Sequence, residues 1–396
     1  TVDELMADMV QMNLGVLRIW GFNDDQNKTT KLQGPNAGDF LEANFQMLDY
    51  VLYQADRHDI RIILPLTNYW NDYGGMRQYV QWTGDTTPTA DEFYGISQAQ
   101  TYFRNFISHL ANRVNTYNQR IYKEDPTILA WQLANEPEYP TDTNTANGSI
   151  LTDWINNTAD YLKNTIGVKQ LVTTGMEGFY DSGNSSKGGQ SWFDNKGTDF
   201  IIQHAGSGID LTGFHIYADH WNLTQVQCEK WIVNHIRDAR RHSQLGKPVI
   251  MDEYGRMVPQ HTMAERNDSF IRYLHTAYRE LVSGTNFWIL YHDAYPNYDN
   301  FGVYYPQDQE TASILIQHAK KINFLNETGI HQLFSFEEDE EGFTKIYTEG
   351  GIIDLIERRE EPSWNRTADG VLCIQCRLGS PGDKAMVGAE IKDPLT

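Results

Sequence analysis

Residues 127–137, TILAWQLANEP, contain the pattern that decides the fold. Apolar side chains run almost without interruption from Ile128 to Ala134, which is typical of a strand buried on both faces of a parallel sheet. The run ends on an amide, a carboxylate and a proline that cannot continue a helix. A buried charge is costly unless it faces a cleft, so we expect Glu136 to lie at the mouth of a pocket.

A second stretch, KPVIMDEYG at residues 247–255, has the same organisation. A short apolar strand ends in Asp252 and Glu253 and is followed by a glycine. Two buried strands that each end in a glutamate are typical of an α/β barrel, whose strand ends carry the chemistry. Hydrolysis of a glycosidic bond usually needs two carboxyl groups that flank the bond. Glu136 and Glu253 are the candidate pair.

Composition limits the classes of partner. The chain has 396 residues, 40% of them hydrophobic, which is enough for one large domain and a tail. Its 32 basic and 53 acidic residues give a net charge of -21, which argues against nucleic acid and anionic membranes as partners and favours a neutral or cationic ligand. No apolar run approaches the roughly 18 residues that would indicate a membrane span.

The cysteines predict neither a metal nor a cofactor. Cys228 is isolated, and Cys373 and Cys376 form a single C-x-x-C with no second ligand pair at the spacing of a zinc site. Eight N-x-S/T sequons are more informative, because their number predicts a secreted glycoprotein. They begin at Asn27, Asn147, Asn156, Asn184, Asn222, Asn267, Asn326 and Asn365.

Strand and helix patterns alternate along residues 1–329. Amphipathic helices are predicted at 2–12, 40–56, 101–114, 153–164, 225–244, 262–282 and 311–325. Seven buried strands are predicted to end near Trp20, Asn68, Glu136, Gly175, Tyr217, Glu253 and Trp288. A (β/α)8 barrel needs one strand more, and we expect it upstream of Thr1; a true seven-stranded barrel is the alternative.

Polar residues inside two of these strands point to the same site. Arg18 lies within an apolar strand, where an unpaired guanidinium is costly, so it should meet a carboxylate. A structural ion pair is one interpretation, and a catalytic pair is favoured because Trp20 follows at the strand end. His215 and Tyr217 are two residues apart and therefore share a face, from which both can hold a carboxylate by hydrogen bonds.

Aromatic residues predict a sugar-binding groove. The segment 71–94 is long and rich in Gly, Tyr and Trp, and we expect it to be a loop that lines this groove. Trp288 and the nearby Tyr291, Tyr295 and Tyr298 belong either to the core or to a sugar platform. We favour a platform for Trp288, because aromatic faces stack on the apolar face of pyranose rings.

Together these residues resemble a known family. The set Arg18, Asn135-Glu136-Pro137, His215-x-Tyr217, Glu253 and Trp288 is similar to glycoside hydrolase family 5, a family of retaining (β/α)8 enzymes. Four sequence segments resemble the endo-β-1,4-mannanases of this family. They are LRIWGFND at 17–24, NYWNDYGGM at 68–76, YKEDPTILAWQLANEP at 122–137 and TTGMEGF at 173–179. The resemblance covers residues 1 to about 325.

This resemblance implies roles for the site residues. Glu136 would be the acid/base, held protonated near neutral pH, and Glu253 the ionised nucleophile, with their carboxyl groups about 5 to 5.5 Å apart. The supporting and substrate-binding residues would be Arg18, Trp20, Asn68, Trp70, Asn135, His215, Tyr217 and Trp288. Many mannanases continue the acid motif with an arginine where this chain has Glu138. The sugar subsites on the leaving-group side should therefore differ from those of the family.

The resemblance therefore implies a secreted, monomeric, retaining endo-β-1,4-mannanase that acts on mannan, glucomannan or galactomannan. A family 5 cellulase, an exo-β-mannosidase and a non-catalytic carbohydrate-binding barrel are the alternatives. Residues 330–396 lie outside the resemblance. For this extension we expect a short β-hairpin around Gly350 and Gly351, followed by a disordered tail or the start of an accessory module.

Overall fold

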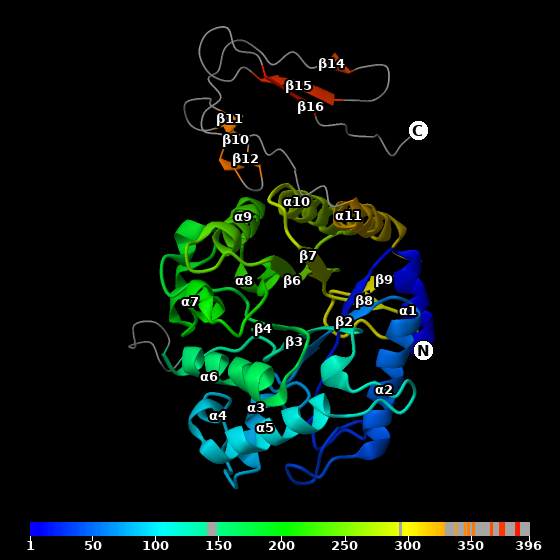
Figure 1. The fold of residues 1–396 in the computed structure, drawn as a ribbon, viewed down its shortest axis with the longest axis vertical. Coiled ribbons are helices and arrows are strands. Elements are labelled where there is room, and N and C mark those ends of the chain that lie inside the picture. Colours follow the sequence, from blue (N-terminus) through cyan, green and yellow to red (C-terminus); the bar gives the residue numbers. More distant parts are fainter. Residues whose placement is uncertain are drawn as a thin grey trace. The chain divides into compact units, whose positions relative to one another are not determined.

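The computed structural model describes residues 1–140, 149–292 and 295–328, together with short strands between 337 and 388 (Figure 1). The chain divides into two compact units, Thr1–Phe324 and Leu325–Thr396. Within the described residues, no helix is long and apolar enough to cross a membrane.

Parallel strands form the centre of the first unit. One set pairs in the order β1, β2, β3 and β4, and a second in the order β5, β6 and β7. A parallel bridge between Thr173 and Leu211 joins the two sets, and β7 contacts β1. The bounds of these strands are β1 Val16–Arg18, β2 Arg61–Pro65, β3 Ile128–Gln132, β4 Leu171–Thr173, β5 Thr212–Tyr217, β6 Val249–Gly255 and β7 Gly284–Phe287. The short strands β8 (Leu290–Tyr291) and β9 (Val303–Tyr304) form a separate parallel pair.

Helices surround these strands, as Figure 1 shows. The longer ones are α1 Val2–Gln11, α2 Glu42–Arg57, α5 Ser97–Ala111, α6 Ser149–Asp160, α9 Gln225–Arg241, α10 Met263–Arg279 and α11 Gln309–Thr328. All seven predicted helices are present, with ends shifted by a few residues. Shorter segments are α3 Gly75–Gln81, α4 Glu92–Gly95, α7 Phe200–Ala205, α8 Ala218–Trp221, the 3-10 helices Tyr122–Glu124, Asn184–Lys187 and Ser191–Asn195, and a π-helical turn at Tyr161–Ile166 that continues α6.

Local sequence sets several helix starts. Thr224 caps α9 and Thr262 caps α10, each through a capping box with the residue three positions later. This reciprocal pairing satisfies backbone N–H groups that the first turn leaves free. Alternating strands and helices, with parallel pairing throughout, give the α/β architecture of a (β/α)8 barrel. This confirms the predicted fold class.

A small cluster of apolar side chains fills the inside of the barrel. Ile63 on β2, Ala130 on β3 and Ile250 on β6 are buried and form one cluster with Leu211. Two larger clusters pack the helices against the outer faces of the two strand sets. Because the interior is filled with side chains, a ligand can only be bound at an end of the strands.

The prediction that residues 71–94 form a groove-lining loop is wrong for most of the segment. The segment contains α3 and α4, and the side chains of Tyr79 and Phe93 are fully buried. Their rings pack on Phe103, which belongs to α5. Aromatic residues there serve the core, because the two short helices turn them inward. Tyr73, before α3, is 42% exposed.

The second unit contains short antiparallel strands. Pairing joins β10 (Glu337–Glu338) to β11 (Thr344–Lys345), β12 (Tyr347–Thr348) to β13 (Gly351–Ile352), and β14 (Asn365–Arg366) to β15 (Leu372–Cys376) and β16 (Ala385–Gly388). The predicted hairpin thus corresponds to the pair β12 and β13. The remaining expectations for the extension fall largely on residues outside the described ones.

Candidate active site

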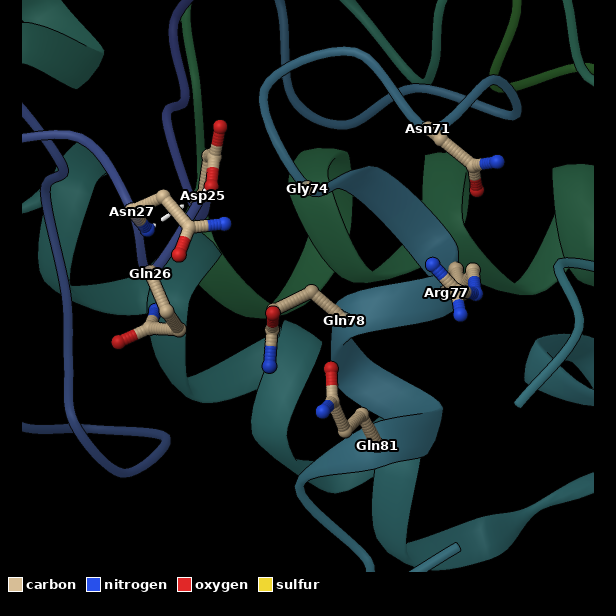
Figure 2. A pocket seen from close by; sticks show the side chains of 8 residues that line it. All are labelled: Asp25, Gln26, Asn27, Asn71, Gly74, Arg77, Gln78 and Gln81. Atoms are coloured by element: carbon tan, nitrogen blue, oxygen red, sulfur yellow. Dashed lines mark hydrogen bonds between the residues drawn. The ribbon is translucent and has the colours of Figure 1, made fainter. Parts of the chain in front are cut away.

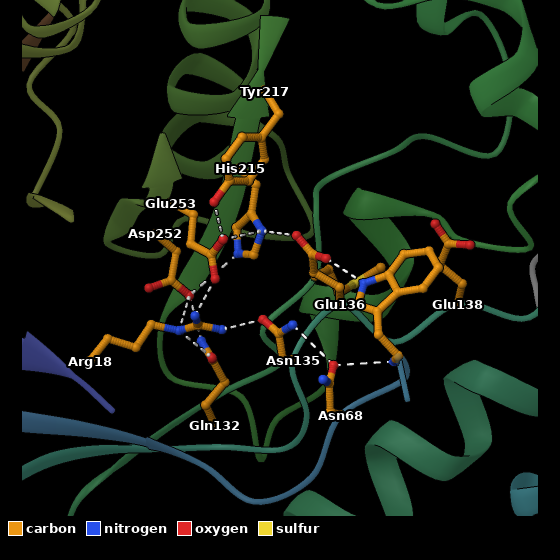
Figure 3. Close-up of polar contacts among 12 residues, drawn as sticks. Arg18, Asn68, Gln132, Asn135, Glu136, Glu138, His215, Tyr217, Asp252 and Glu253 are labelled. Carbon is orange, nitrogen blue, oxygen red and sulfur yellow. Dashed lines mark hydrogen bonds and ion pairs between the residues drawn. The ribbon is translucent and has the colours of Figure 1, made fainter. Parts of the chain in front are cut away.

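Arg18 organises the polar residues at the carboxyl ends of the strands (Figure 3). It is the last residue of β1, and its side chain is only 5% exposed. Its guanidinium donates from Nε to Gln132 Oε1 at 2.8 Å, from Nη2 to Asn135 Oδ1 at 2.7 Å, and from Nη1 to Glu253 Oε1. The prediction that Arg18 meets a carboxylate is confirmed. One buried cation therefore ties β1, β3 and β6 together at the site.

Glu253 receives hydrogen bonds from two strong donors. Besides Arg18, the Tyr217 hydroxyl donates to Glu253 Oε2 at 2.5 Å. Burial raises the pKa of Glu253, and the nearby charges of His215 and Arg18 lower it; the net pKa is above its usual value of 4.5. Proximity to the Glu136 carboxylate contributes to this rise, since two like charges disfavour each other.

Glu136 has an unusual backbone and different partners. Its φ of 48° places it in the left-handed region, which is sparsely populated by residues other than glycine. His215 Nδ1 lies 2.6 Å from Oε1, and Trp70 Nε1 donates to Oε2 at 2.5 Å. The turn after β3 thus directs this carboxyl group between β2 and β5.

Glu136 and His215 shift each other's pKa in opposite directions. Burial opposes both charges, but the hydrogen bond to His215, the indole of Trp70 and the charge of Arg18 together lower the pKa of Glu136. Burial lowers the pKa of His215, and the carboxylates of Glu253 and Glu136 more than compensate, so that it is raised. The contact between the two side chains offers a route by which a proton can pass between imidazole and carboxyl group.

The two carboxyl groups are close together. One oxygen of Glu136, one oxygen of Glu253 and a ring nitrogen of His215 all lie within 4.8 Å of one another. These are also the described side chains best placed to hold a metal ion. The guanidinium of Arg18 already supplies a positive charge to Glu253. A separation this small suits attack by one carboxylate, since inverting hydrolysis needs about 6.5 to 9.5 Å.

Three amides and an acid fix these groups in place. Asn135 Nδ2 donates to Asn68 Oδ1 at 3.1 Å, and Gln132 Nε2 donates to Asp252 Oδ2 at 2.5 Å. Asn68 and Asn135 thus lie beside Arg18 and Glu136, and their substrate-binding roles stay predictions. Sequence reasoning missed Gln132 as a site residue. Its signal was a polar residue within an apolar buried strand.

A lysine and aromatic rings lie on one flank of the site, beside Glu136. Lys196 Nζ contacts Glu138 Oε1 at 2.7 Å and Oε2 at 2.9 Å. The ammonium lies 5.4 Å from the ring centroid of Trp192 and 6.0 Å from that of Trp70. Trp70 and Trp192 are 40% and 44% exposed. We call Trp70, Glu138, Trp192 and Lys196 the lysine flank; nothing in the sequence pattern had indicated Lys196.

A buried acid, Glu177, lies behind this flank. Its pKa is raised well above the usual value by burial and by the charges of Glu136 and Glu138. A protonated Glu177 carboxyl can donate to Glu138, with which it shares a hydrogen bond. Burial raises the pKa of Glu138 too, and its hydrogen bonds with Lys196 and Glu177 hold the buried carboxyl group in place.

A second group of aromatic rings lies beside Arg18. Trp20 and Trp288 lie with ring centroids 6.0 Å apart, and Trp288 Nε1 donates to Asp299 Oδ2 at 2.7 Å. The guanidinium of Arg18 lies 5.2 Å from the ring centroid of Trp20. Tyr295 and Tyr298 follow in the same loop as Asp299 and are 65% and 66% exposed. We call Trp20, Tyr73, Trp288, Tyr295 and Tyr298 the tryptophan flank.

The fold and this site define a class of protein. A parallel α/β barrel that brings two carboxyl groups together at its strand ends, between two rows of aromatic rings, is a glycoside hydrolase. Comparison with known proteins gives the family. The family model described as GH family 5 beta-mannosidase-like matches residues 3–291, and the chain belongs to glycoside hydrolase family 5.

Individual relatives agree with this assignment. The chain is 32% identical over 347 residues to putative mannan endo-1,4-beta-mannosidase 4 of Arabidopsis thaliana, covering 83% of each chain. The endo-beta-1,4-mannanase structure from Thermotoga petrophila superimposes with a TM-score of 0.73 at 30% identity, over 81% of this chain and 73% of that one. The endo-1,4-beta-mannanase of Rhizomucor miehei gives 0.70 at 30% identity, over 82% and 90%.

Proposed function

We propose that the protein is a retaining endo-β-1,4-mannanase with Glu253 as nucleophile and Glu136 as acid/base. The observation that carries this proposal is the approach of the two carboxyl groups to within 4.8 Å between two aromatic flanks. The names of the three relatives reported above, a mannan endo-1,4-beta-mannosidase and two endo-mannanases, support the substrate.

The first step forms a covalent bond to the enzyme. A carboxylate oxygen of Glu253 attacks the anomeric carbon, while Glu136 gives a proton to the departing glycosidic oxygen. Arg18 and Tyr217 hold Glu253 in the attacking position through hydrogen bonds. The proton reaches Glu136 from His215 across the 2.6 Å contact between Nδ1 and Oε1.

The second step releases the sugar. Glu136, now a carboxylate, takes a proton from a water molecule, which attacks the anomeric carbon and displaces Glu253. His215 can receive that proton in turn, so the pair returns to its starting state. Both steps use the same two carboxyl groups, and the product retains the anomeric configuration.

The two flanks favour endo action. Because Glu136 must face the leaving group, the lysine flank beside it contacts the sugars on the leaving-group side. The tryptophan flank then contacts the sugars on the other side. Exposed rings on both sides of the carboxyl pair allow a polysaccharide to extend in both directions, whereas an exo-enzyme needs a wall on one side.

We also propose that the protein is an extracellular glycoprotein and a monomer. Of the described sequon asparagines, Asn156 and Asn222 are exposed and can carry glycans, whereas Asn27 is exposed but lines a pocket that a glycan would occupy. Asn184 and Asn267 are buried and hydrogen-bonded, so the folded protein cannot carry glycans there. The sequon count therefore overstates the support for secretion, which now rests on two described sites.

Reducing-sugar release from linear β-1,4-mannan, carboxymethyl cellulose and xylan tests the activity. We expect mannan-selective release of short oligosaccharides. Glu253→Ala should lower kcat by about 10^4-fold or more, and Glu136→Gln by about 10²- to 10^4-fold. A small anion such as azide separates the roles: it should give an α-glycosyl azide with Glu253→Ala and a β-glycosyl azide with Glu136→Ala. Release from no polymer by a folded protein would refute the proposal.

A further inference from the structure

A polar pocket lies between the loop after β1 and helix α3 (Figure 2). Its volume is about 330 Å³, near the lower end of the range for small-molecule sites. It is lined by Asp25, Gln26, Asn27, Asn71, Gly74, Arg77, Gln78 and Gln81. None of these residues takes part in the chemistry described above, so the pocket needs an explanation of its own.

The side chains that line the pocket suit a neutral ligand rich in hydroxyl groups. Five of the eight lining residues are Asn or Gln, one is an acid and one is a base. An amide both donates and accepts hydrogen bonds, as a sugar hydroxyl does. Asp25 and Arg77 balance in charge, so neither an anion nor a cation is favoured. The lining contains no aromatic ring, in contrast to the two flanks of the active site.

Gln78 gives independent evidence for a ligand. This residue on α3 is only 8% exposed. Its side-chain amide forms no hydrogen bond with any other residue in the described part of the chain. Figure 2 shows it directed from α3 toward the Asp25–Asn27 turn and into the pocket. The amide atoms themselves remain accessible from the pocket, where they are free to bond a ligand.

The pocket adjoins the active-site groove. Asn71 follows Trp70, whose indole donates to Glu136. Tyr73, which belongs to the tryptophan flank, accepts a hydrogen bond on its carbonyl oxygen from the Asp24 backbone N–H at 2.8 Å. A Cβ on Gly74 would lie 2.6 Å from the Asp24 carbonyl carbon, so the two loops are in close contact there. The pocket wall is therefore fixed to residues that border the groove.

We propose that this pocket binds a single hexose branch carried by a β-mannan main chain, such as the galactosyl branch of galactomannan. The inference rests on the proposed function. The two aromatic flanks are the surfaces suited to stacking on main-chain sugars, whereas this pocket has no aromatic ring and lies beside them. A branch leaves the main chain sideways, and its hydroxyl groups can bond the amides of the pocket. The pocket would thereby make the enzyme tolerant of, and selective for, branched mannan.

Gln78→Met tests the inference, because methionine keeps the length and removes the amide. The enzyme is produced without glycosylation, so that Asn27 at the pocket carries no glycan. We expect kcat/KM on an α-galactosylated β-manno-oligosaccharide to fall about five- to tenfold, as for one lost hydrogen bond to ligand. On the unbranched oligosaccharide of equal length it should change less than about twofold. Gln81→Ala, also in the pocket, should act in the same direction, and Gln46→Met on α2 is the matched control.

Two results would overturn the inference while leaving the proposed function intact. One is an equal loss on branched and unbranched substrates, which would mean that Gln78 supports the fold or the main chain. The other is no change on either substrate. If the wild-type protein hydrolyses no mannan, the proposed function fails instead. Ligand-observed NMR with a galactosylated mannotriose and the Glu136→Gln protein then tests the pocket, and binding that Gln78→Met does not weaken refutes it.

Discussion

Glu136 and Glu253 are the same residue type, equally buried, and differ in their hydrogen-bond donors. Glu253 is bound by Arg18 and Tyr217, whereas Glu136 is bound by His215 and Trp70. A guanidinium does not give up its proton in a protein, but an imidazolium does so near neutral pH. Glu253 is therefore positioned by a permanent charge, and Glu136 is connected to a transferable proton. The donors, and not the carboxyl groups, would then distinguish the proposed nucleophile Glu253 from the proposed acid/base Glu136.

Replacing Arg18, the permanent positive charge, should cause the largest loss of activity. Arg18→Met leaves a buried carboxylate without its cation, and breaking a buried pair costs about 3 to 5 kcal/mol. We expect kcat/KM at neutral pH to fall about 10²- to 10³-fold. The pKa of Glu253, already raised by burial, should rise further. Since the nucleophile must be ionised, activity is lost as pH falls through this pKa, and the acid limb of the pH–rate profile should move to higher pH.

Two variants control this experiment. Arg18→Lys keeps the charge and should shift the acid limb less than Arg18→Met. Arg272→Met removes a cation whose side chain is 43% exposed and bonded to Glu229, and it should be nearly silent. If the acid limb of Arg18→Met lies at the same pH as that of the wild type, the cation does not hold Glu253 ionised. That result would contradict the proposed difference between Glu253 and Glu136.

Replacing His215, the group that can transfer a proton, should cause an intermediate loss of activity. The pKa of His215 is raised by Glu253 and Glu136, so the pair keeps its proton below this pKa and loses it as pH rises through it. The alkaline limb of kcat/KM should thus lie above pH 6.5. In His215→Asn, we expect a loss of about 10- to 100-fold and an alkaline limb at lower pH, set by the Glu136 carboxyl alone. An unchanged alkaline limb would mean that His215 only supports the structure.

The lysine flank should give the smallest effect. Glu138 accepts two hydrogen bonds from Lys196, which leaves one ammonium hydrogen for a sugar hydroxyl on the leaving-group side. In Lys196→Met, we expect KM for long manno-oligosaccharides to rise about five- to tenfold with kcat nearly unchanged. Lys187→Met is matched, because Lys187 also bonds a carboxylate, Asp238, beside an aromatic ring. A fall in kcat alone would assign Lys196 to the chemistry.

Much of the fold and both carboxyl groups could be predicted from the sequence. Buried strands, amphipathic helices and turn residues are local patterns, and each strand that ends in a polar residue places that residue at the same end of a parallel sheet. The structure confirms the contacts of Arg18 with a carboxylate and of His215 and Tyr217 with the two glutamates. A period of two along a strand was sufficient to predict that His215 and Tyr217 share a face.

Only the tertiary structure decided which donor meets which carboxyl group. Arg18 and Glu253 are 235 residues apart, and His215 and Glu136 are 79 residues apart. Local patterns carry no information on such pairings. The same limit explains why Lys196 was missed and why residues 71–94 were predicted as a groove-lining loop. The sequence determined the strands and the chemical groups at their ends. The closing of the chain around them determined the contact between His215 and Glu136, the lysine flank and the polar pocket, because these depend on contacts between distant segments.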